Sequence, residues 1–140
     1  MAHFQTFRLK ELADNIGVSL TDILITCYHC RRWLTAHEKI LFEHGNLCLI
    51  WKDNLPYACC PACIRVTARL DFLLGYTRTV TWSTFADVCS YPWETVCIRC
   101  VTCLRLLNEA EKRELEHTDG VIFLIKDSFR AHCCLCKIGL

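Results

Sequence analysis

Eight of the thirteen cysteines fall into two quartets of identical spacing, and this feature constrains the fold more than any other. In each quartet a Cys-x-x-Cys pair is followed by a second such pair, which begins 30 residues after the first pair ends. The quartets are Cys27, Cys30, Cys60 and Cys63, and Cys100, Cys103, Cys133 and Cys136. A constant offset of 73 residues maps one quartet onto the other, which indicates an internal duplication.

The spacing is typical of structural zinc sites. Two thiolates separated by two residues can both reach one tetrahedral zinc ion at about 2.3 Å, and a second pair completes the site. Each quartet spans under 40 residues, too few for a stable core, so we expect metal binding to supply folding free energy and the metal-free chain to be largely unfolded. A single Cys-x-x-Cys could instead be a redox pair, but two matched quartets argue against that interpretation. We therefore predict two zinc ions.

Five cysteines lie outside the quartets. They are Cys48, Cys59, Cys89, Cys97 and Cys134. Cys97 forms an alternative Cys-x-x-Cys with Cys100, but only the pair of Cys100 and Cys103 preserves the 73-residue offset. We predict that all five are small apolar side chains or unreactive thiols rather than ligands.

Composition and the apolar runs indicate the cellular compartment of the chain and whether it crosses a membrane. Residues 1–8 of this 140-residue chain contain no continuous apolar core and no small-residue cleavage site, so we predict no secretory signal. Disulfides are then disfavoured. The longest apolar runs, such as residues 121–125, are far shorter than the roughly 20 residues of a membrane span. We expect a soluble intracellular protein with no membrane segment.

Charge and hydrophobicity favour a protein partner over a nucleic acid. Sixteen Lys and Arg residues balance fifteen Asp and Glu residues, so no global field draws the chain to phosphate backbones. The chain is 53% hydrophobic, and apolar surface that a small core cannot hide often faces a partner. A binding protein is the preferred interpretation.

The expected fold class is α+β, with two small duplicated four-cysteine zinc domains, each a short antiparallel sheet with short helices. Residues 1–26 are predicted to form a helical arm of two short helices, with a break at residues 15–17. Residues 27–63 form the first zinc domain, with β-prone runs at 40–42, 47–51 and 57–58. Thr35 to Glu38 and Asn108 to Glu111 have the pattern of capping boxes that open a helical turn.

The second zinc domain covers residues 100–136, with residues 121–125 as its best strand. Residues 64–99 are predicted to be a connector that begins as a helix and ends that helix at Gly75. Its later aromatic residues suggest that the connector packs against one or both domains and holds them in a fixed orientation, with a groove between them. Residues 137–140 form a short tail.

With the zinc residues placed, the chain closely resembles the papillomavirus early oncoprotein of the two-zinc-domain type. The resemblance covers nearly the whole chain. Besides the doubled quartet, it rests on Leu47-Cys48-Leu49-Ile50-Trp51-Lys52-Asp53 leading to Pro56-Tyr57-Ala58, on Ile98-Arg99-Cys100, and on Leu107-Asn108 leading to Glu111-Lys112.

The resemblance implies an adaptor without an active site, in the host nucleus and host cytoplasm. Members of the family hold an acidic Leu-x-x-Leu-Leu helix of a host protein in the groove between the zinc domains and the connecting helix. The partner is a HECT-type ubiquitin ligase or a Mastermind-like coactivator. Such binding redirects ubiquitination, blocks apoptosis and alters host transcription.

The same resemblance places the peptide-binding residues. The apolar wall falls on Leu47, Cys48, Ile50, Cys59, Ile64, Thr67 and Ala68. Arg99 is expected to meet the acid of the peptide or cap its helix, and Arg8 and Lys10 to add charge at the rim. For the apolar residues, a place in the core of a module is an equally good interpretation, and for Arg99 the alternative is a solvated surface charge.

Two features set this chain apart from some relatives. Ser128-Phe129 stands where many relatives have an Arg-Trp pair, so peptide preference is expected to differ. The tail after Cys136 lacks the usual PDZ-binding sequence, and with the neutral charge this resembles cutaneous or animal-virus members. Two other functions stay open: a zinc-dependent nucleic-acid-binding transcription regulator, and, with little support, a thiol-disulfide oxidoreductase.

Overall fold

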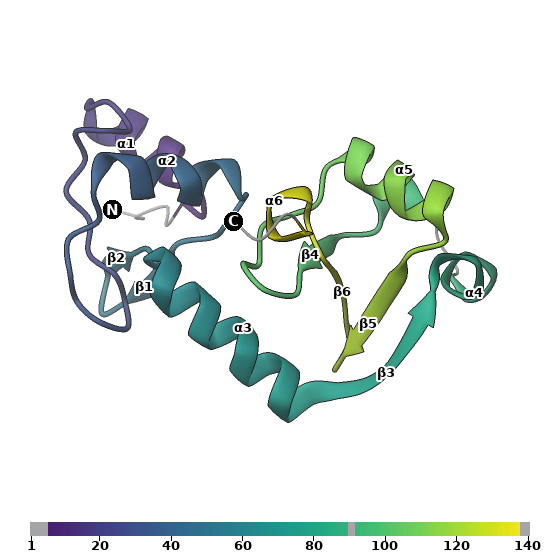
Figure 1. The fold of residues 1–140 in the computed structure, drawn as a ribbon. Helices are drawn as coiled ribbons and strands as arrows, with labels where there is room; N and C mark the ends of the chain where they lie inside the picture. Colours follow the sequence, from purple (N-terminus) through teal and green to yellow (C-terminus); the bar gives the residue numbers. More distant parts are fainter. Residues whose placement is uncertain (1–5, 90–91, 138–140) are drawn as a thin grey trace. The chain divides into compact units, whose positions relative to one another are not determined.

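The computed structural model describes residues 6–89 and 92–137 and confirms an α+β fold built on two four-cysteine clusters. The chain divides into two compact units, one ending at Ile64 and one beginning at Arg65 (Figure 1). Each unit has its own hydrophobic core and its own sheet. None of the described helices has the length and apolar character needed to cross a membrane.

Unit 1 combines two helices with a small hairpin. Its elements are α1 (Leu9–Ile16), α2 (Ala36–His44), β1 (Ile50–Lys52) and β2 (Leu55–Tyr57). The two strands pair antiparallel, with Trp51 opposite Pro56. Helix α3 (Pro61–Gly75) starts inside the second cysteine pair of unit 1 and continues into unit 2.

Unit 2 contains a four-stranded sheet of order β3-β5-β6-β4. Its elements are β3 (Tyr76–Thr81), α4 (Trp82–Val88), a single 3₁₀ turn (Trp93–Thr95), β4 (Ile98–Cys100), α5 (Glu109–Thr118), β5 (Val121–Ile125), β6 (Ser128–Ala131) and α6 (Cys134–Lys137). β5 pairs antiparallel with both β3 and β6, whereas β4 runs parallel to β6.

The 73-residue repeat extends to the backbone. Four described residues of unit 1 other than glycine have positive φ, and for three of them the residue 73 positions later has nearly the same φ. The pairs are Arg31 (63°) and Leu104 (62°), Asn46 (54°) and Asp119 (49°), and Asp53 (53°) and Lys126 (52°). Left-handed conformations are uncommon outside glycine, so this agreement shows that both units follow the same chain path.

A buried lysine fixes the segment that leads into the first quartet. Lys39 lies on α2, and its ammonium donates hydrogen bonds to the carbonyl oxygens of Thr21 (2.6 Å) and Ile23 (2.8 Å). These carbonyls lie in a segment that no sheet satisfies, so the ammonium takes the place of a strand partner.

The same device recurs in unit 2. Lys112 on α5 is buried, and its ammonium donates to the carbonyls of Trp93 (3.4 Å), Glu94 (3.3 Å) and Val96. Lys112, Glu94 and Val96 stand 73 positions after Lys39 and its two acceptors. The repeat therefore begins well before the first cysteine of each quartet.

This result corrects the predicted boundaries at residues 26 and 99. Residues of the predicted arm and connector supply part of each hydrophobic core. Large core side chains correspond at the 73-residue offset: Leu9 and Trp82, Leu12 and Phe85, and Phe42 and Leu115. Most of the predicted connector belongs to unit 2, where β3 pairs with β5 and α4 packs into the core.

The prediction of two helices in residues 1–26 is wrong for the described part. α1 ends at Ile16, where Gly17 takes a left-handed conformation (φ 88°), which confirms the predicted break. After a turn, residues 23–25 run extended, with Ile23 and Ile25 buried and Leu24 exposed. Alternating burial is the mark of an extended segment, and β-branched isoleucine favours it.

The predicted β-prone run at residues 40–42 is also wrong, because it lies in the middle of α2. Both predicted capping boxes are present, and they begin full helices rather than single turns. The Thr35 side chain accepts from the Glu38 N–H, while the Glu38 side chain accepts from the Thr35 N–H. Once this nucleus forms, residues 39 and 42 face the core at helical spacing.

Helix α3 confirms the helical start of the connector and its end at Gly75. A side chain at this position would be impossible without rearrangement, since a Cβ on Gly75 would lie 2.7 Å from Cγ of Lys126. The Gly75 carbonyl also accepts a hydrogen bond from the Lys126 N–H (2.8 Å). The chain therefore passes from α3 into β3 without a loop.

Replacing Lys39 by methionine should lower the free energy of unfolding by about 1.5–3 kcal/mol, because two buried carbonyls lose a charged donor. Lys10→Met is the matched control, since the Lys10 side chain is exposed and its ion pair is with Asp14 one helical turn away; we expect a change within about 0.5 kcal/mol. Chemical denaturation of the zinc-loaded protein measures both. Equal stability of the two variants would contradict the structural role of Lys39.

Candidate metal centres and peptide-contact residues

The structure brings together both predicted quartets. In each cluster the four Sγ atoms lie within 4.8 Å of one another. The Sγ atoms of Cys30 and Cys60 are 3.8 Å apart, and those of Cys103 and Cys133 are also 3.8 Å apart. Four sulfurs at about 2.3 Å from a tetrahedral zinc ion are separated by about 3.8 Å. The clusters therefore fit zinc, and four thiolates with no open position mark a structural rather than a catalytic site.

Tight backbone turns place the first pair of each cluster. The Arg31 N–H donates to the Cys27 carbonyl (2.9 Å), and the Leu104 N–H donates to the Cys100 carbonyl (2.9 Å). The left-handed conformation of Arg31 and Leu104 lets the chain reverse directly after each pair.

Helix starts and short parallel pairings place the second pair. Cys60 directly precedes α3 and Cys133 directly precedes α6. Cys27 pairs with Ala58 in unit 1, and Cys100 pairs in the same parallel sense with Ala131 in unit 2. These pairings bring the two halves of each cluster side by side.

Backbone N–H groups favour a thiolate at the first cysteine of each cluster. Burial of Cys27 opposes its ionisation, but the N–H groups of Cys30, Cys60 and His29 outweigh burial and lower the pKa of Cys27 to about 6. Because the thiolate is the metal-binding form, one ligand in the cluster is already prepared.

Cys100 has the corresponding surroundings. The Cys103 thiol lowers its pKa, burial opposes this, and the N–H groups of Cys133 and Thr102 lower it further; the resulting pKa of Cys100 is about 4. Thr102 N lies 3.4 Å and Cys133 N lies 3.5 Å from Cys100 Sγ. Burial raises the pKa of two further cluster thiols, Cys63 and Cys136, to about 12.

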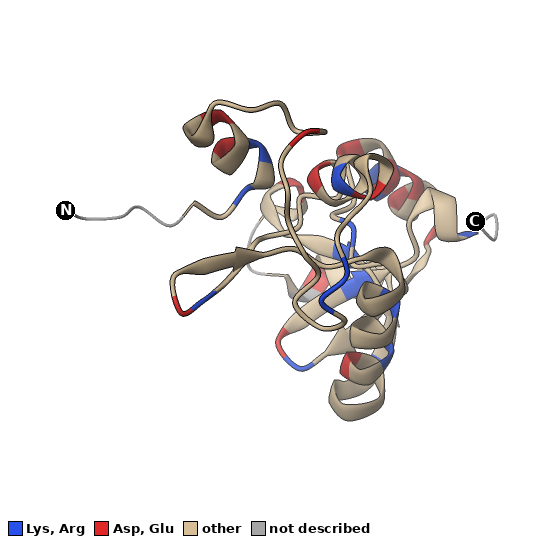
Figure 2. Ribbon diagram, turned by 90° about the vertical axis from the view of Figure 1, so that its left-hand side faces the viewer, with Lys and Arg blue, Asp and Glu red and all other residues tan. Residues whose placement is uncertain are grey.

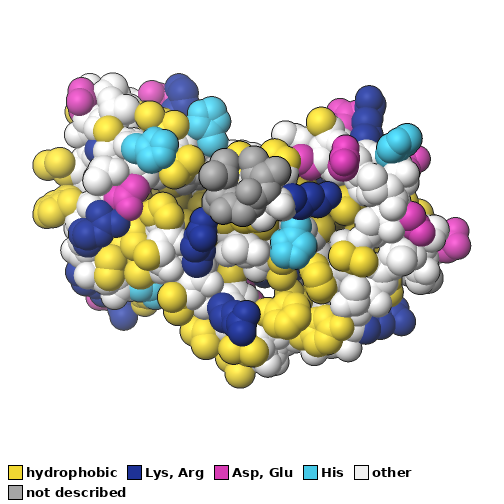
Figure 3. All heavy atoms as spheres, viewed as in Figure 1, with side chains coloured by type: hydrophobic (Ala, Val, Ile, Leu, Met, Phe, Trp, Pro, Cys, Tyr) yellow, Lys and Arg dark blue, Asp and Glu magenta, His cyan; other side chains and the backbone are white. Residues whose placement is uncertain are grey.

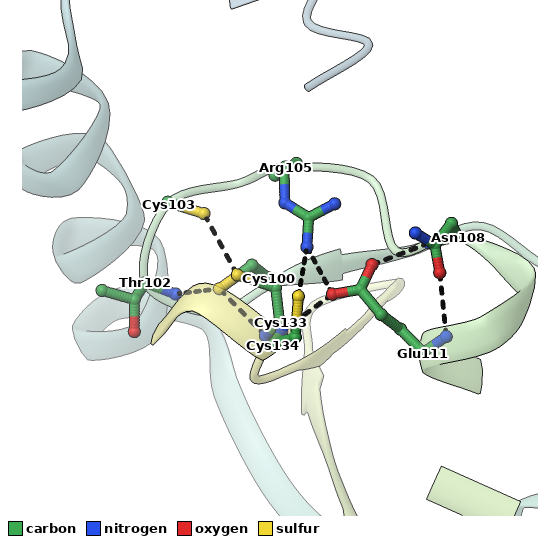
Figure 4. A network of polar contacts seen from close by, with 8 residues as sticks. All are labelled: Cys100, Thr102, Cys103, Arg105, Asn108, Glu111, Cys133 and Cys134. Carbon is green, nitrogen blue, oxygen red and sulfur yellow. Dashed lines mark hydrogen bonds and ion pairs between the residues drawn. The ribbon is translucent and has the colours of Figure 1, made fainter. Parts of the chain in front are cut away.

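An acidic side chain connects the second cluster to α5 (Figure 4). Glu111 accepts hydrogen bonds from the N–H groups of Asn108 (3.0 Å) and Cys134 (2.8 Å), and it pairs with the Arg105 guanidinium. Burial opposes the charge on Glu111, but these donors outweigh burial and hold its pKa below the ordinary value. The capping residue of α5 therefore also orients the chain beside the ligand Cys133.

Unit 1 has a more exposed version of this contact. Arg32 forms a two-pronged ion pair with Glu38, with N–O distances of 2.9 and 2.6 Å. Bonding to Arg32 lowers the pKa of Glu38 to about 2. Sequence analysis identified both capping boxes, but their connection to the cysteine clusters appears only in the structure.

A family model described as Early Protein (E6) matches residues 27–136, which include both quartets. The chain belongs to the papillomavirus E6 family. Protein E6 of Human papillomavirus type 1 is 31% identical over 93% of this chain and 93% of its own length. Protein E6 of Human papillomavirus 25 is 34% identical over 92% of this chain and 80% of its own. Protein E6 of Human papillomavirus 4 is 28% identical over 97% of both. The E6 match confirms the resemblance seen in the sequence.

The five remaining cysteines lie outside the two clusters, as predicted. Cys48, Cys97 and Cys134 are exposed, while Cys59 and Cys89 are half-buried and pack against the cores. Burial raises the pKa of the Cys59 thiol to about 11, so it stays neutral at physiological pH.

The predicted apolar peptide contacts of this E6-family chain divide by exposure. Leu47 and Cys59 pack against the core of unit 1, and Ile50 is half-buried in β1, while Cys48 is exposed. On α3, Ile64 and Ala68 are buried and Thr67 is half-buried. Their contact with a peptide stays a prediction.

Two of the three predicted cationic contacts, Arg99 and Arg8, are tied to the fold. The Arg99 guanidinium is half-buried and donates to the Leu104 carbonyl (2.9 Å), the reversal point of the second cysteine turn. Arg8 pairs with Glu43 (2.6 Å) and bonds Asn46, so it joins α1 to the end of α2. Lys10 alone has the exposed position expected at a rim.

Unit 2 contains a basic cavity that sequence analysis missed. Its volume is about 280 Å³, and it is lined by Arg65, Arg69, Phe72, Val101, Thr102, Phe123 and His132. Figure 3 shows a hollow in this region bordered by Lys or Arg, His and hydrophobic side chains. The lining contains no acidic residue. Its members come from α3, the second cysteine turn and the sheet, and no single stretch of sequence brings them together.

Charges elsewhere are mixed. Figure 2 shows Lys or Arg and Asp or Glu positions interspersed over the ribbon, and α5 itself carries Lys112 and Arg113 between two pairs of glutamates.

We expect two zinc ions per purified chain. Cys97→Ser should retain both, because Cys97 is exposed and outside the cluster, whereas Cys103→Ser should retain one. Elemental analysis measures the ratio of zinc to protein. Loss of zinc from Cys97→Ser with retention in Cys103→Ser would move the second site to the other register.

Glu111→Gln should weaken zinc binding at the second site by about 10-fold or more, since outer groups that orient ligands typically contribute this much. The control is Glu114→Gln, an exposed position on the same helix. Chelator competition that resolves the two sites measures the effect, and the first site should be unchanged. Equal affinity in both variants would show that the Glu111 contacts do not support the cluster.

Proposed function

We propose that this E6-family chain is a viral adaptor that captures acidic Leu-x-x-Leu-Leu helices of host proteins. The expected partners are a HECT-type ubiquitin ligase or a Mastermind-like coactivator. Capture would redirect ubiquitination, block apoptosis and alter host transcription, in the host nucleus and host cytoplasm. Membership of the E6 family is the observation that carries this proposal.

Unit 1 supplies apolar surface suited to helix binding. Leu47 and Ile50 are only partly buried, and Cys48 beside them is exposed. In helix-in-groove recognition, apolar anchors at helical spacing on the ligand contact such side chains. Ile50 lies on a short hairpin, and Leu47 and Cys48 lie just before it; a hairpin of this size needs the zinc cluster to form a stable surface.

Arg99 supplies a positioned positive charge. Its bond to the Leu104 carbonyl fixes the guanidinium beside the second cysteine turn. A guanidinium has five N–H donors in a planar fork, which suits a carboxylate or the last carbonyls of a helix. The basic cavity of unit 2 adds further charge of the sign that an acidic ligand requires.

Arg99→Ala should weaken binding of an acidic Leu-x-x-Leu-Leu peptide by about 10- to 150-fold, the equivalent of about 1.5–3 kcal/mol for a partly shielded charged contact. Both zinc ions should stay bound. Arg113→Ala is the control, because Arg113 is exposed and pairs only with Glu109 on its own helix; binding should change little. Fluorescence polarisation measures the affinities.

Ile50→Asp separates a binding role from a core role. If Ile50 contacts the peptide, the carboxylate should abolish binding while zinc content and circular dichroism stay unchanged. If Ile50 is a core residue, the variant should lose zinc from unit 1 and its circular dichroism should change. Failure of well-folded, two-zinc wild-type protein to bind the peptide at high micromolar concentration would overturn the proposal, and a salt-dependent gel shift would then test nucleic-acid binding.

A further inference from the structure

Helix α3 itself contains the sequence pattern of the proposed ligand. Residues 70–74 read Leu70-Asp71-Phe72-Leu73-Leu74, a Leu-x-x-Leu-Leu motif with an acidic residue inside it. Positions i, i+3 and i+4 of a helix lie on one face. The motif falls wholly within the regular part of α3, which ends at Gly75.

The three leucines point into solvent. Leu70 is 50% exposed, Leu73 is 62% exposed and Leu74 is 77% exposed, and Val66 one turn earlier is exposed as well. Figure 3 shows hydrophobic side chains gathered over the C-terminal half of α3. A contiguous row of large apolar side chains on one helix face is unusual for a surface without a partner.

The opposite side of α3 is anchored to unit 2. Asp71 pairs with Arg130 of β6 (3.4 Å), and the Phe72 ring contacts Tyr76 and Phe123, with centroid distances of 4.8 and 5.9 Å. These contacts fix the rotation of the helix about its axis. The leucines are therefore held outward, and the helix is already folded before any partner binds.

We propose that α3 is a self-recognition helix: Leu70, Leu73 and Leu74 of one copy dock in the peptide site of a second copy. This inference rests on the proposed function, because the occupant is chosen by the match between the motif and the ligand class of that site. A preformed helix also avoids the ordering cost that a free peptide pays on binding.

Charge makes this contact weaker than that of an acidic host helix. Asp71, the acid within the motif, is already paired with Arg130, and Arg65 and Arg69, six and two residues before it, are basic. The self-contact is therefore mainly apolar, and an acidic host helix should displace it. Self-association would then occupy the site until a partner arrives.

The two contact surfaces differ, so the association is heterologous. Such contacts close into a ring or continue as an open chain, depending on the rotation between copies. Association should therefore increase with protein concentration. A variant that lacks either the α3 leucines or the peptide site should not associate with itself.

The test is analytical ultracentrifugation of the 140-residue chain, with both zinc ions bound, over a range of protein concentrations. Wild type should self-associate, and the double variant Leu73→Glu, Leu74→Glu should raise the dissociation constant at least about 10-fold. Both positions are exposed, so zinc content and circular dichroism should be unchanged. The matched control is Leu24→Glu, since Leu24 is 79% exposed in unit 1; it should associate as wild type does.

Two further measurements identify the occupant. An acidic host Leu-x-x-Leu-Leu peptide should dissociate the wild-type oligomer. Folded, two-zinc Ile50→Asp, which retains the leucines but loses the apolar site, should not associate with itself. It should associate with the variant Leu73→Glu, Leu74→Glu, which retains the site. An oligomer that the peptide does not dissociate would overturn the docking site proposed for α3.

The outcomes for the two proposals are distinguishable. Protein that binds the host peptide but stays monomeric, or a leucine double variant that associates as the Leu24 control does, overturns self-recognition and leaves the adaptor function in place. Protein that binds no host peptide overturns the adaptor function, and any association it shows then excludes docking in the peptide site. Full host-peptide binding by the leucine double variant, with association lost, supports both.

Discussion

The structure depends on the geometry of two four-cysteine clusters. Each cluster joins a tight turn to the start of a helix across an intervening stretch of about 30 residues, and each gathers four sulfurs within 4.8 Å of one another, close enough for one tetrahedral zinc ion. Neither unit is long enough to hold such a pairing through apolar burial alone. The hairpin in unit 1, the parallel strand pair in unit 2 and the path of α3 all follow from this constraint.

Buried polar side chains add a second set of contacts that stabilise each unit. Lys39 and Lys112 supply donors to carbonyls that no strand reaches, and Glu38 and Glu111 combine helix capping with an ion pair near the cysteines. A buried ammonium is costly to bury unless its bonds are satisfied. A lysine bonded in this way occurs in both units. The arrangement is therefore a feature of the repeated fold and not of one local sequence.

The surface carries features of two kinds. Some are positioned by the clusters, such as Arg99 of β4, bonded to the second cysteine turn, and Ile50 on the unit 1 hairpin. Others result from how α3 is rotated against the sheet of unit 2, which turns Phe72 inward and Leu73 outward. An adaptor needs both, because a rigid scaffold holds contact residues in place at little entropic cost on binding.

Sequence alone determined the ligand sets, their register, the duplication, the two capping boxes and the family. Those features depend on spacing within short stretches, and thiolate chemistry allows few alternatives at that spacing. Tertiary structure decided what depends on distant partners. Residues 40–42 became helix because the Thr35 cap and the core outweighed their β propensity. Residues 76–81 form a strand because they pair with β5. Lys39 is buried because its ammonium bonds two backbone carbonyls, 16 and 18 residues earlier in the chain, that have no strand partner. The exposure of the α3 leucines was likewise hidden in the sequence, where an apolar row on a helix is the same whether it faces a core or a partner.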